Sequence, residues 1–225
     1  MLVLFDIDGT LLLGTPRAHT EALAAAIGDV WGVSADVQDV VAVRPAGRTD
    51  REIARLVLRG RGVGDEDVTA GMEEWIARAA ALYPEIDGRH PDPPVAPGAA
   101  EALARVAAAP VRTALLTGNI EPIAHAKMAR AGLGGWFTPG RGAFGSDHEV
   151  REELVPIAVA REGAPVEAVV VGDTPRDIAC ARAGGARVVA VTTGSYGPDE
   201  LAAADAVVPG LVAAAEVIED WARAA

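Results

Sequence analysis

Short apolar runs recur along the chain and alternate with stretches of helical periodicity. Residues 2–5, Leu-Val-Leu-Phe, form an unbroken apolar run directly before Asp6, which is typical of a strand covered by helices on both faces. Similar runs follow at residues 113–116, 169–171 and 188–191, with helical patterns between them. Alternating strands and helices predict an α/β fold, a Rossmann-like doubly wound parallel sheet.

Proline and glycine mark the ends of the predicted helices in the sheet region. Proline favours a first helical turn, and glycine favours the position just past a last turn. These signals predict helices over about residues 97–109, 121–132, 175–184 and 210–224.

The segment between the first two predicted strands has a different pattern. Its helical periodicity is not interrupted by a strand pattern and covers residues 19–27, 49–58 and 68–82. Pro-Asp-Pro-Pro, just before the second half of the chain, is typical of a stiff linker. We therefore predict an inserted α-helical cap domain over residues 14–94 and a core formed by residues 1–13 and 95–225.

Charge and composition exclude several classes of partner. The chain carries 32 acidic and 20 basic side chains, a net charge of −12, which disfavours a broad basic surface for nucleic acid or anionic lipid. No apolar run reaches the roughly 18 to 20 residues of a membrane-spanning helix. The single cysteine, Cys180, and the lack of a signal-peptide pattern predict a cytoplasmic protein. We thus expect no nucleic acid and no membrane as partner, and the oligomeric state stays open.

Acidic and hydroxyl residues follow three of the predicted strands. They are Asp6 and Asp8, residues 117–119 (Thr-Gly-Asn), and Asp173 with Asp177. Ligands of an open α/β sheet bind beyond the carboxyl ends of its strands, so these residues are expected to converge. Carboxylates gathered in one crevice repel one another unless a cation is present. Mg²⁺ prefers such oxygen ligands together with substrate phosphate, so the pattern predicts Mg²⁺ and a phosphate ester.

The residue types suggest a division of roles at this edge. Asp6 is the candidate nucleophile, which would form an aspartyl-phosphate, and Asp8 is the candidate acid and base for the leaving oxygen and the attacking water. The candidate phosphate binders are Thr10, Thr117, Gly118 and Asn119.

These motifs resemble those of the haloacid dehalogenase superfamily, in its phosphatase branch with an α-helical cap, which includes phosphoglycolate phosphatases and β-phosphoglucomutase-like proteins. The resemblance covers the chain from end to end and lies in Asp6-x-Asp8-Gly9-Thr10, in Thr117, and in Gly172-Asp173-x-x-x-Asp177. It implies that Asp6 is the nucleophile, Asp8 the acid and base, and Thr117 a phosphate binder. It also implies that Mg²⁺ is held by Asp6, Asp173 and Asp177 with the backbone carbonyl of Asp8.

One motif departs from the family pattern. The family places a lysine or arginine near the start of the helix before the last acidic strand, where it balances the charge of the nucleophile. Arg151 is the basic residue in that region here, and the single lysine, Lys127, is its rival. Lys127 lies ten residues after Thr117, about 15 Å along a continuous helix, so we favour Arg151 for this role.

The predicted cap offers one candidate for substrate selection. Gly47-Arg48-Thr49-Asp50 combines a turn, a basic side chain and a helix start, so Arg48 is a candidate for binding a second anionic group of the substrate. The alternative is a solvated structural arginine.

The sequence therefore predicts a Mg²⁺-dependent hydrolase of a small phosphomonoester. A phosphomutase acting on a sugar phosphate would share every catalytic residue, and a catalytically degenerate binding or regulatory protein is a further alternative. A dehalogenase of the same superfamily is disfavoured by Asp8 and the late pair Asp173 and Asp177. Phosphoglycolate and sugar phosphates are candidate substrates at the level of the family alone.

Overall fold

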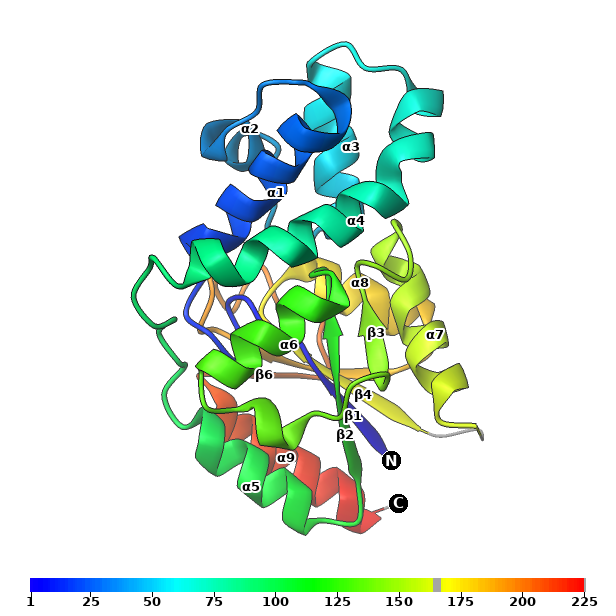
Figure 1. The fold of residues 1–225 in the computed structure, drawn as a ribbon. Coiled ribbons are helices and arrows are strands. Elements are labelled where there is room, and N and C mark those ends of the chain that lie inside the picture. The colour runs from blue at the N-terminus through cyan, green and yellow to red at the C-terminus, as the bar shows by residue number, and fades with distance from the viewer. Residues whose placement is uncertain (164–166, 225) are drawn as a thin grey trace.

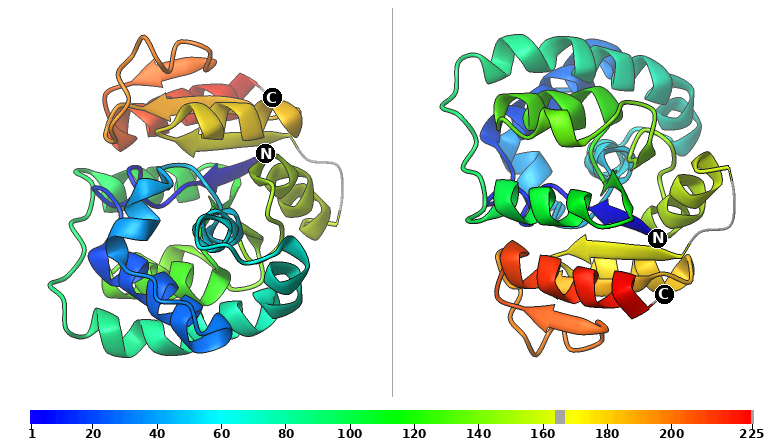
Figure 2. Two further views of the ribbon diagram at one scale, coloured as in Figure 1. Left: turned by 90° about the horizontal axis from the view of Figure 1, so that it is seen from above. Right: turned by 90° about the horizontal axis from the view of Figure 1, so that it is seen from below.

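A computed structural model describes residues 1–163 and 167–224 of the chain. It consists of a parallel sheet flanked by helices and a separate group of helices above one end of the sheet (Figure 1). The first strand begins close to the place where the last helix ends, on the side of the sheet away from that group (Figures 1 and 2).

The sheet has six parallel strands in the order β3-β2-β1-β4-β5-β6. The strands are β1 (Leu2–Phe5), β2 (Arg112–Thr117), β3 (Gly142–Phe144), β4 (Ala168–Gly172), β5 (Arg187–Val191) and β6 (Ala206–Val208). Because β1 lies between β2 and β4, the residues that follow these three strands meet at the middle of one sheet edge.

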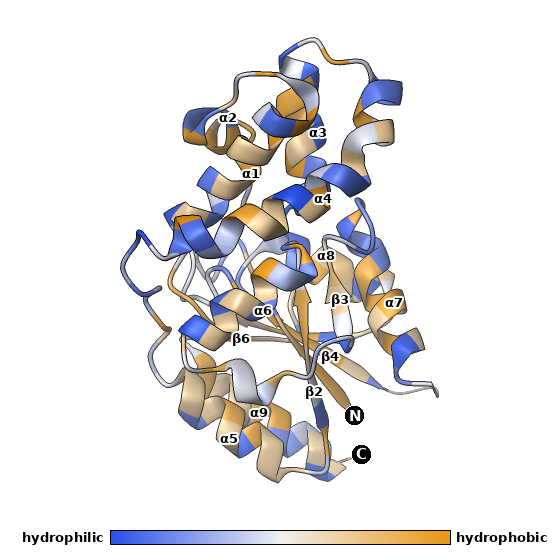
Figure 3. Cartoon of the chain, viewed as in Figure 1, coloured by the Kyte–Doolittle hydropathy of each residue, from blue (hydrophilic) through white to orange (hydrophobic). Residues whose placement is uncertain are grey.

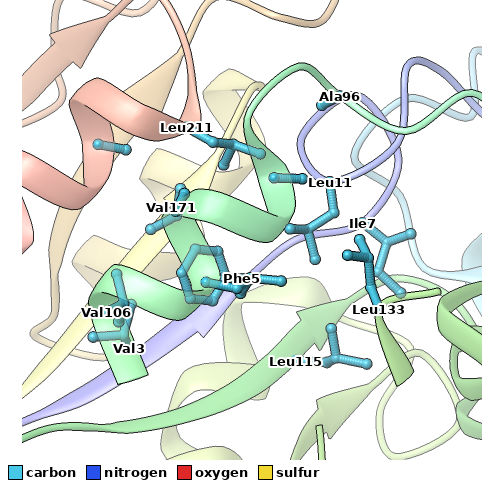
Figure 4. Close-up of a cluster of buried hydrophobic side chains, with 14 of the residues drawn as sticks. Val3, Phe5, Ile7, Leu11, Ala96, Val106, Leu115, Leu133, Val171 and Leu211 are labelled. Atoms are coloured by element: carbon cyan, nitrogen blue, oxygen red, sulfur yellow. The ribbon is translucent and has the colours of Figure 1, made fainter. Parts of the chain in front are cut away.

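Helices cover both faces of the sheet, and the alternation of side chains along β1 decides which residue meets which layer. Val3 and Phe5 pack toward α5, α6 and α9, in the apolar cluster of Figure 4, whereas Leu2 and Leu4 pack toward α7 and α8. Strands β1 and β4 are buried and apolar along their length, as Figure 3 shows. These helices are α5 (Ala99–Ala108), α6 (Glu121–Arg130), α7 (Leu154–Arg161), α8 (Pro175–Ala183) and α9 (Leu211–Ala224).

The remaining helices form a group of their own, here called the cap. They are α1 (Arg17–Trp31), α2 (Val37–Ala42), α3 (Asp50–Gly60) and α4 (Asp65–Asp87). They enclose a second apolar cluster around Trp75, which also takes in Ile120 and Ile123 beside and in α6. The two connections to the cap run side by side, because Leu12 pairs with Val95 and the Leu13 amide donates to the Pro94 carbonyl at 2.8 Å.

The structure confirms the α/β fold and corrects several details of the expected elements. The sequence pattern did not reveal β3, β6 or α2, because runs of three to six residues carry too little periodicity. The helix before β4, near whose start Arg151 was expected, begins only at Leu154, and Arg151 lies in a short 3₁₀ turn at Arg151–Glu153 ahead of it. No helix in residues 1–163 and 167–224 is long and apolar enough to cross a membrane.

Candidate active site

A cavity of about 300 Å³ lies between the carboxyl edge of the sheet and the cap. Its lower wall comes from the residues after β1, β2, β4 and β5, which include Asp6, Thr117 and Asp173. Its upper wall comes from the cap and the connection leading into it, with His19 and Arg48 among the lining residues. The volume is at the low end for small-molecule sites, so the occupant has few atoms.

Three buried carboxylates meet at the floor of this cavity. Asp6 follows β1, Asp173 follows β4, and Asp177 lies in the first turn of α8, and oxygens of all three lie within 4.8 Å of one another. Burial and the neighbouring Asp177 raise the pKa of Asp6 well above its usual value. The same two causes raise the pKa of Asp173 to about 7. The cluster therefore lacks positive charge to balance it.

Two glycines leave the room that Asp173 needs. Gly9 has a φ of +94°, and an ideal Cβ there would lie 2.2 Å from Asp173 Oδ2. A Cβ on Gly194, in the loop after β5, would lie 1.7 Å from the same oxygen. A side chain at either position would displace the carboxylate, so these glycines maintain the cluster geometry.

Arg151 is the cation of the acidic floor. Its Nη2 donates to Asp6 Oδ1 at 3.0 Å and to Asp177 Oδ1, and the side chain is buried. Burial alone would lower the pKa of Arg151, but the two carboxylates outweigh it and raise the pKa. Its Nε has no acceptor within the described part of the chain. A cavity-lining guanidinium with a free N–H is suited to an oxyanion.

Lys127 also reaches the site, so the expected 15 Å separation was wrong. Its Nζ donates to Asp8 Oδ2 at 2.7 Å and to Asn119 Oδ1 at 2.6 Å. The chain turns through residues 118–120 before α6 starts, which brings Lys127 much closer to the sheet edge than one continuous helix would. A helical side chain also points back toward the helix start, and the long lysine stem adds further reach. Both candidate cations are therefore present, on different carboxylates.

Lys127 lowers the pKa of the Asp8 carboxyl. Burial alone would raise the pKa of the Asp8 carboxyl, but the Lys127 ammonium, with a smaller contribution from His19, outweighs burial and lowers the pKa. Asp6 and Asp8 lie only two residues apart, but their pKa values shift in opposite directions. The raised pKa of Asp6 favours its neutral form, and the lowered pKa of Asp8 favours its charged form.

Two predicted phosphate binders have other partners. The Thr10 hydroxyl donates to Asp173 Oδ1 at 3.0 Å, and Thr10 does not line the cavity. The Asn119 amide donates to Asp8 Oδ2 at 2.9 Å, and its oxygen accepts from Lys127. Both side chains hold carboxylates in position. Thr117, Gly118 and Asn119 do line the cavity.

The cap contacts this edge through a short segment. Asp50 donates its amide to the Gly118 carbonyl at 2.7 Å, and its carboxylate accepts from the Ile120 amide at 2.8 Å. An ideal Cβ on Gly118 would lie 1.9 Å from the Arg48 carbonyl oxygen. Glycine is therefore required where the cap backbone approaches most closely.

His19 joins the cap to the buried lysine. Its Nε2 lies 2.9 Å from Asp50 Oδ2 and its Nδ1 lies 3.1 Å from Lys127 Nζ. His19 is not among the site residues predicted from the sequence, and Asp50 was named only as part of a helix start. A signal was present, because His19 shares the apolar stripe of α1 with Ala22 and Leu23, where a polar residue needs a partner.

Arg48 lines the cavity, but its guanidinium already has partners. Nη1 donates to Glu52, and Nε donates to the carbonyls of Val43 at 3.1 Å and Arg44 at 3.2 Å. The side chain therefore faces the cavity as part of an ion pair.

Comparison with known proteins gives two matching family models. The model described as haloacid dehalogenase-like hydrolase matches residues 3–182, and a second, HAD-hydrolase-like model matches residues 151–215. The first match includes all of the acidic residues around the cavity floor.

Individual proteins are similar over most of their lengths. A protein of Dickeya dadantii named "Probable phosphatase IndB" is 32% identical over 207 residues, which are 91% of this chain and 86% of that protein. A phosphoglycolate phosphatase of Rhodospirillum rubrum is 29% identical over 204 residues, 85% of this chain and 79% of that protein. The crystal structure of CbbY from Rhodobacter sphaeroides in complex with phosphate has the same fold, with a TM-score of 0.66 at 20% identity over 94% of each chain.

Proposed function

The chain belongs to the haloacid dehalogenase-like hydrolases, and from this premise we propose that it cleaves a small phosphomonoester through an aspartyl-phosphate on Asp6, with Mg²⁺. The observation that carries the proposal is the cavity floor, where buried Asp6, Asp173 and Asp177 surround an arginine whose Nε lacks an acceptor. Such a floor combines a nucleophile, a cation site and an oxyanion binder.

The donor set fits Mg²⁺. Three carboxylates with one arginine leave the cluster short of positive charge, and the raised pKa values of Asp6 and Asp173 reflect that shortage. Hard oxygen ligands of this kind suit Mg²⁺. We assign Asp6, Asp173, Asp177 and the backbone carbonyl of Asp8 as its ligands. When bound, the metal would offset the charge of the carboxylates and of the transferring phosphoryl group.

The first step is attack by Asp6. A carboxylate oxygen of Asp6 forms a bond to phosphorus while the bond from phosphorus to the leaving oxygen breaks. Asp8, which must first take up a proton against its lowered pKa, donates that proton to the leaving oxygen. Arg151 contacts Asp6 and lines the cavity, so its guanidinium is placed to contact the phosphoryl oxygens. The Thr117 hydroxyl and the Gly118 backbone, at the end of β2, are placed to contact the same oxygens.

The second step releases phosphate. Asp8, now a carboxylate beside Lys127, accepts a proton from water, and the water oxygen bonds to phosphorus as the bond to Asp6 breaks. The lowered pKa of Asp8 favours the carboxylate form that this step needs. Lys127 and Asn119 keep Asp8 in place, and Thr10 does the same for Asp173.

The cap, which we assign to residues 14–94, closes the site over the core of residues 1–13 and 95–225. It covers the phosphoryl group and limits access of bulk water. A small substrate fits this arrangement, since the cavity holds about 300 Å³.

The test is a screen of small phosphomonoesters for release of inorganic phosphate, with Mg²⁺ and with a chelator. We expect release in Mg²⁺ that the chelator abolishes, and the Asp6→Asn variant serves as the inactive control. No release from any ester in Mg²⁺ would contradict the proposal. Recovery of an isomerised sugar phosphate without free phosphate would instead identify a phosphomutase.

A further inference from the structure

The upper wall of the cavity carries little free charge. Its apolar part consists of Leu23, Val40, Pro45, Ala46 and Ile53. The His19 ring nitrogens both have partners, in Asp50 and Lys127, and the Thr20 hydroxyl donates to the Arg17 carbonyl at 2.8 Å. The part of the substrate beyond the phosphate therefore meets apolar surface and polar groups that are already satisfied.

Arg48 is the cation of this wall, and it forms an ion pair with Glu52. Arg48 lies just before α3, and Glu52 lies one turn later in that helix, so the two side chains share a face. The pair is partly shielded, with side-chain exposures of 20% and 27%. Two backbone carbonyls accept from the Arg48 Nε and fix the head group further. The charge that Arg48 would offer an incoming anion is thus balanced within the cap.

The remaining charges of the cavity also disfavour a second anion. Among the lining residues that the structure describes, the carboxylates are Asp6, Asp8, Asp50 and Asp173, and the cations are Arg48 and Arg151. Arg151 already contacts Asp6 and Asp177 at the floor. Phosphate and metal would use the floor, so a carboxylate or second phosphate at the cap end would face a wall without an unpaired cation.

From these observations we infer that the leaving group of the substrate is uncharged, and that Glu52 sets this preference by neutralising Arg48. The inference rests on the proposed phosphatase function and narrows its substrate class to monophosphates of neutral, partly apolar groups. It also revises the expectation that Arg48 binds a second anionic group. Arg48 stays a lining residue, able to donate to a hydroxyl or carbonyl of a neutral group.

The test compares two esters of nearly equal size that differ in one charge. Phosphoglycolate carries a carboxylate, and its amide, phosphoglycolamide, does not. Both are assayed with the full-length protein and Mg²⁺, as substrates by phosphate release and as competitive inhibitors of aryl phosphate hydrolysis. For the wild type we expect the amide to have the higher kcat/KM, or the lower Ki, by roughly tenfold.

The Glu52→Gln variant assigns the cause. Freeing Arg48 is expected to lower the ratio of kcat/KM for phosphoglycolamide to kcat/KM for phosphoglycolate by roughly three- to tenfold. Adding Arg48→Gln to that variant is expected to reverse the shift. Glu85→Gln is the matched control, because it breaks an exposed ion pair of the same four-residue spacing, between Glu85 near the end of α4 and Arg89 just after that helix. Its ratio is expected to equal that of the wild type.

The outcomes separate this inference from the function on which it rests. A wild type that prefers phosphoglycolate, or a Glu52→Gln variant with an unchanged ratio, would overturn the inference and leave the phosphatase function intact. Absence of phosphate release from the aryl phosphate and from every other ester would overturn the function itself, and the inference with it.

Discussion

The two walls of the cavity differ in how far their charged side chains are balanced. At the floor, Asp6, Asp173 and Asp177 are held together with one arginine, and burial together with the neighbouring Asp177 raises the pKa values of Asp6 and Asp173. At the cap wall, Arg48 pairs with Glu52 and Asp50 lies beside His19 within hydrogen-bonding distance. The floor thus carries carboxylates that one arginine does not balance, whereas the charged side chains of the cap wall are paired with one another. This difference indicates that chemistry belongs to the floor and selection to the cap.

The strongest test of this contrast replaces one carboxylate in each wall. Asp6→Asn removes the nucleophile and is expected to lower kcat by at least about a thousandfold. Asp50→Asn keeps an acceptor for the Ile120 amide and is expected to lower kcat by roughly tenfold at most. The measurement is single-turnover phosphate release with the best ester of the screen. Equal losses in the two variants would contradict the division between floor and cap.

We expect Lys127 to act together with the residues of the floor, through Asp8, although His19 of the cap also contacts it. Lys127→Met keeps much of the side-chain volume but leaves Asp8 buried without its cation, so kcat is expected to fall by roughly a hundred- to a thousandfold. The expected change in KM is small, because Lys127 does not line the cavity. Steady-state kinetics measure both constants, and circular dichroism checks the fold. A kcat within threefold of the wild type would show that Asp8 does not depend on Lys127.

Gly118→Ala tests the contact between the walls and adds no charge. The new Cβ would overlap the Arg48 carbonyl, so the cap could not approach the sheet edge as it does here, and kcat/KM is expected to fall by roughly tenfold or more. Gly135→Ala is the matched control, because nothing lies within 4 Å of its added Cβ. If Gly118→Ala retained wild-type kinetics, the close approach would be irrelevant to turnover.

The smallest effect concerns stability. Mg²⁺ at about a hundred times its Kd is expected to raise the melting temperature by roughly 5 to 10 °C. The raised pKa of Asp173, about 7, means that protonation stabilises the metal-free fold at low pH and that this contribution is lost as the pH rises through 7. Mg²⁺ replaces the proton, so its stabilising effect is expected to be larger at pH 8 than at pH 6. Thermal melts at both pH values, with chelator-treated controls, would show no Mg²⁺-dependent shift at either pH if the cluster did not bind metal.

The sequence predicted the floor better than the cap, for a physical reason. Asp6, Asp8 and Asp173 follow buried strands, and in a parallel sheet strand ends converge regardless of how far apart they lie in the chain. Thr10 and Asp173 show this, because they form a hydrogen bond across 163 positions of sequence. A local pattern was therefore enough to identify a long-range cluster.

The other residues depend on tertiary contacts that no local pattern encodes. The position of Lys127 follows from the turn before α6, and that of His19 from its contacts with Asp50 and Lys127, which lie far from it in the sequence. The partners of Arg48 and Asn119 likewise became visible only in the folded chain. Short elements such as β3 were missed because three residues do not establish a period.

The paired connections at Leu12 and Val95 have a consequence for engineering. The chain leaves and re-enters the sheet region at adjacent, hydrogen-bonded positions. The ends of the insertion therefore lie side by side, and we expect that modules of other lengths can be grafted there without altering the strand order. A graft would have to re-cover Ile120 and Ile123, which pack against the present insertion. Exchange of this module is accordingly a route to new substrate ranges on an unaltered reaction centre.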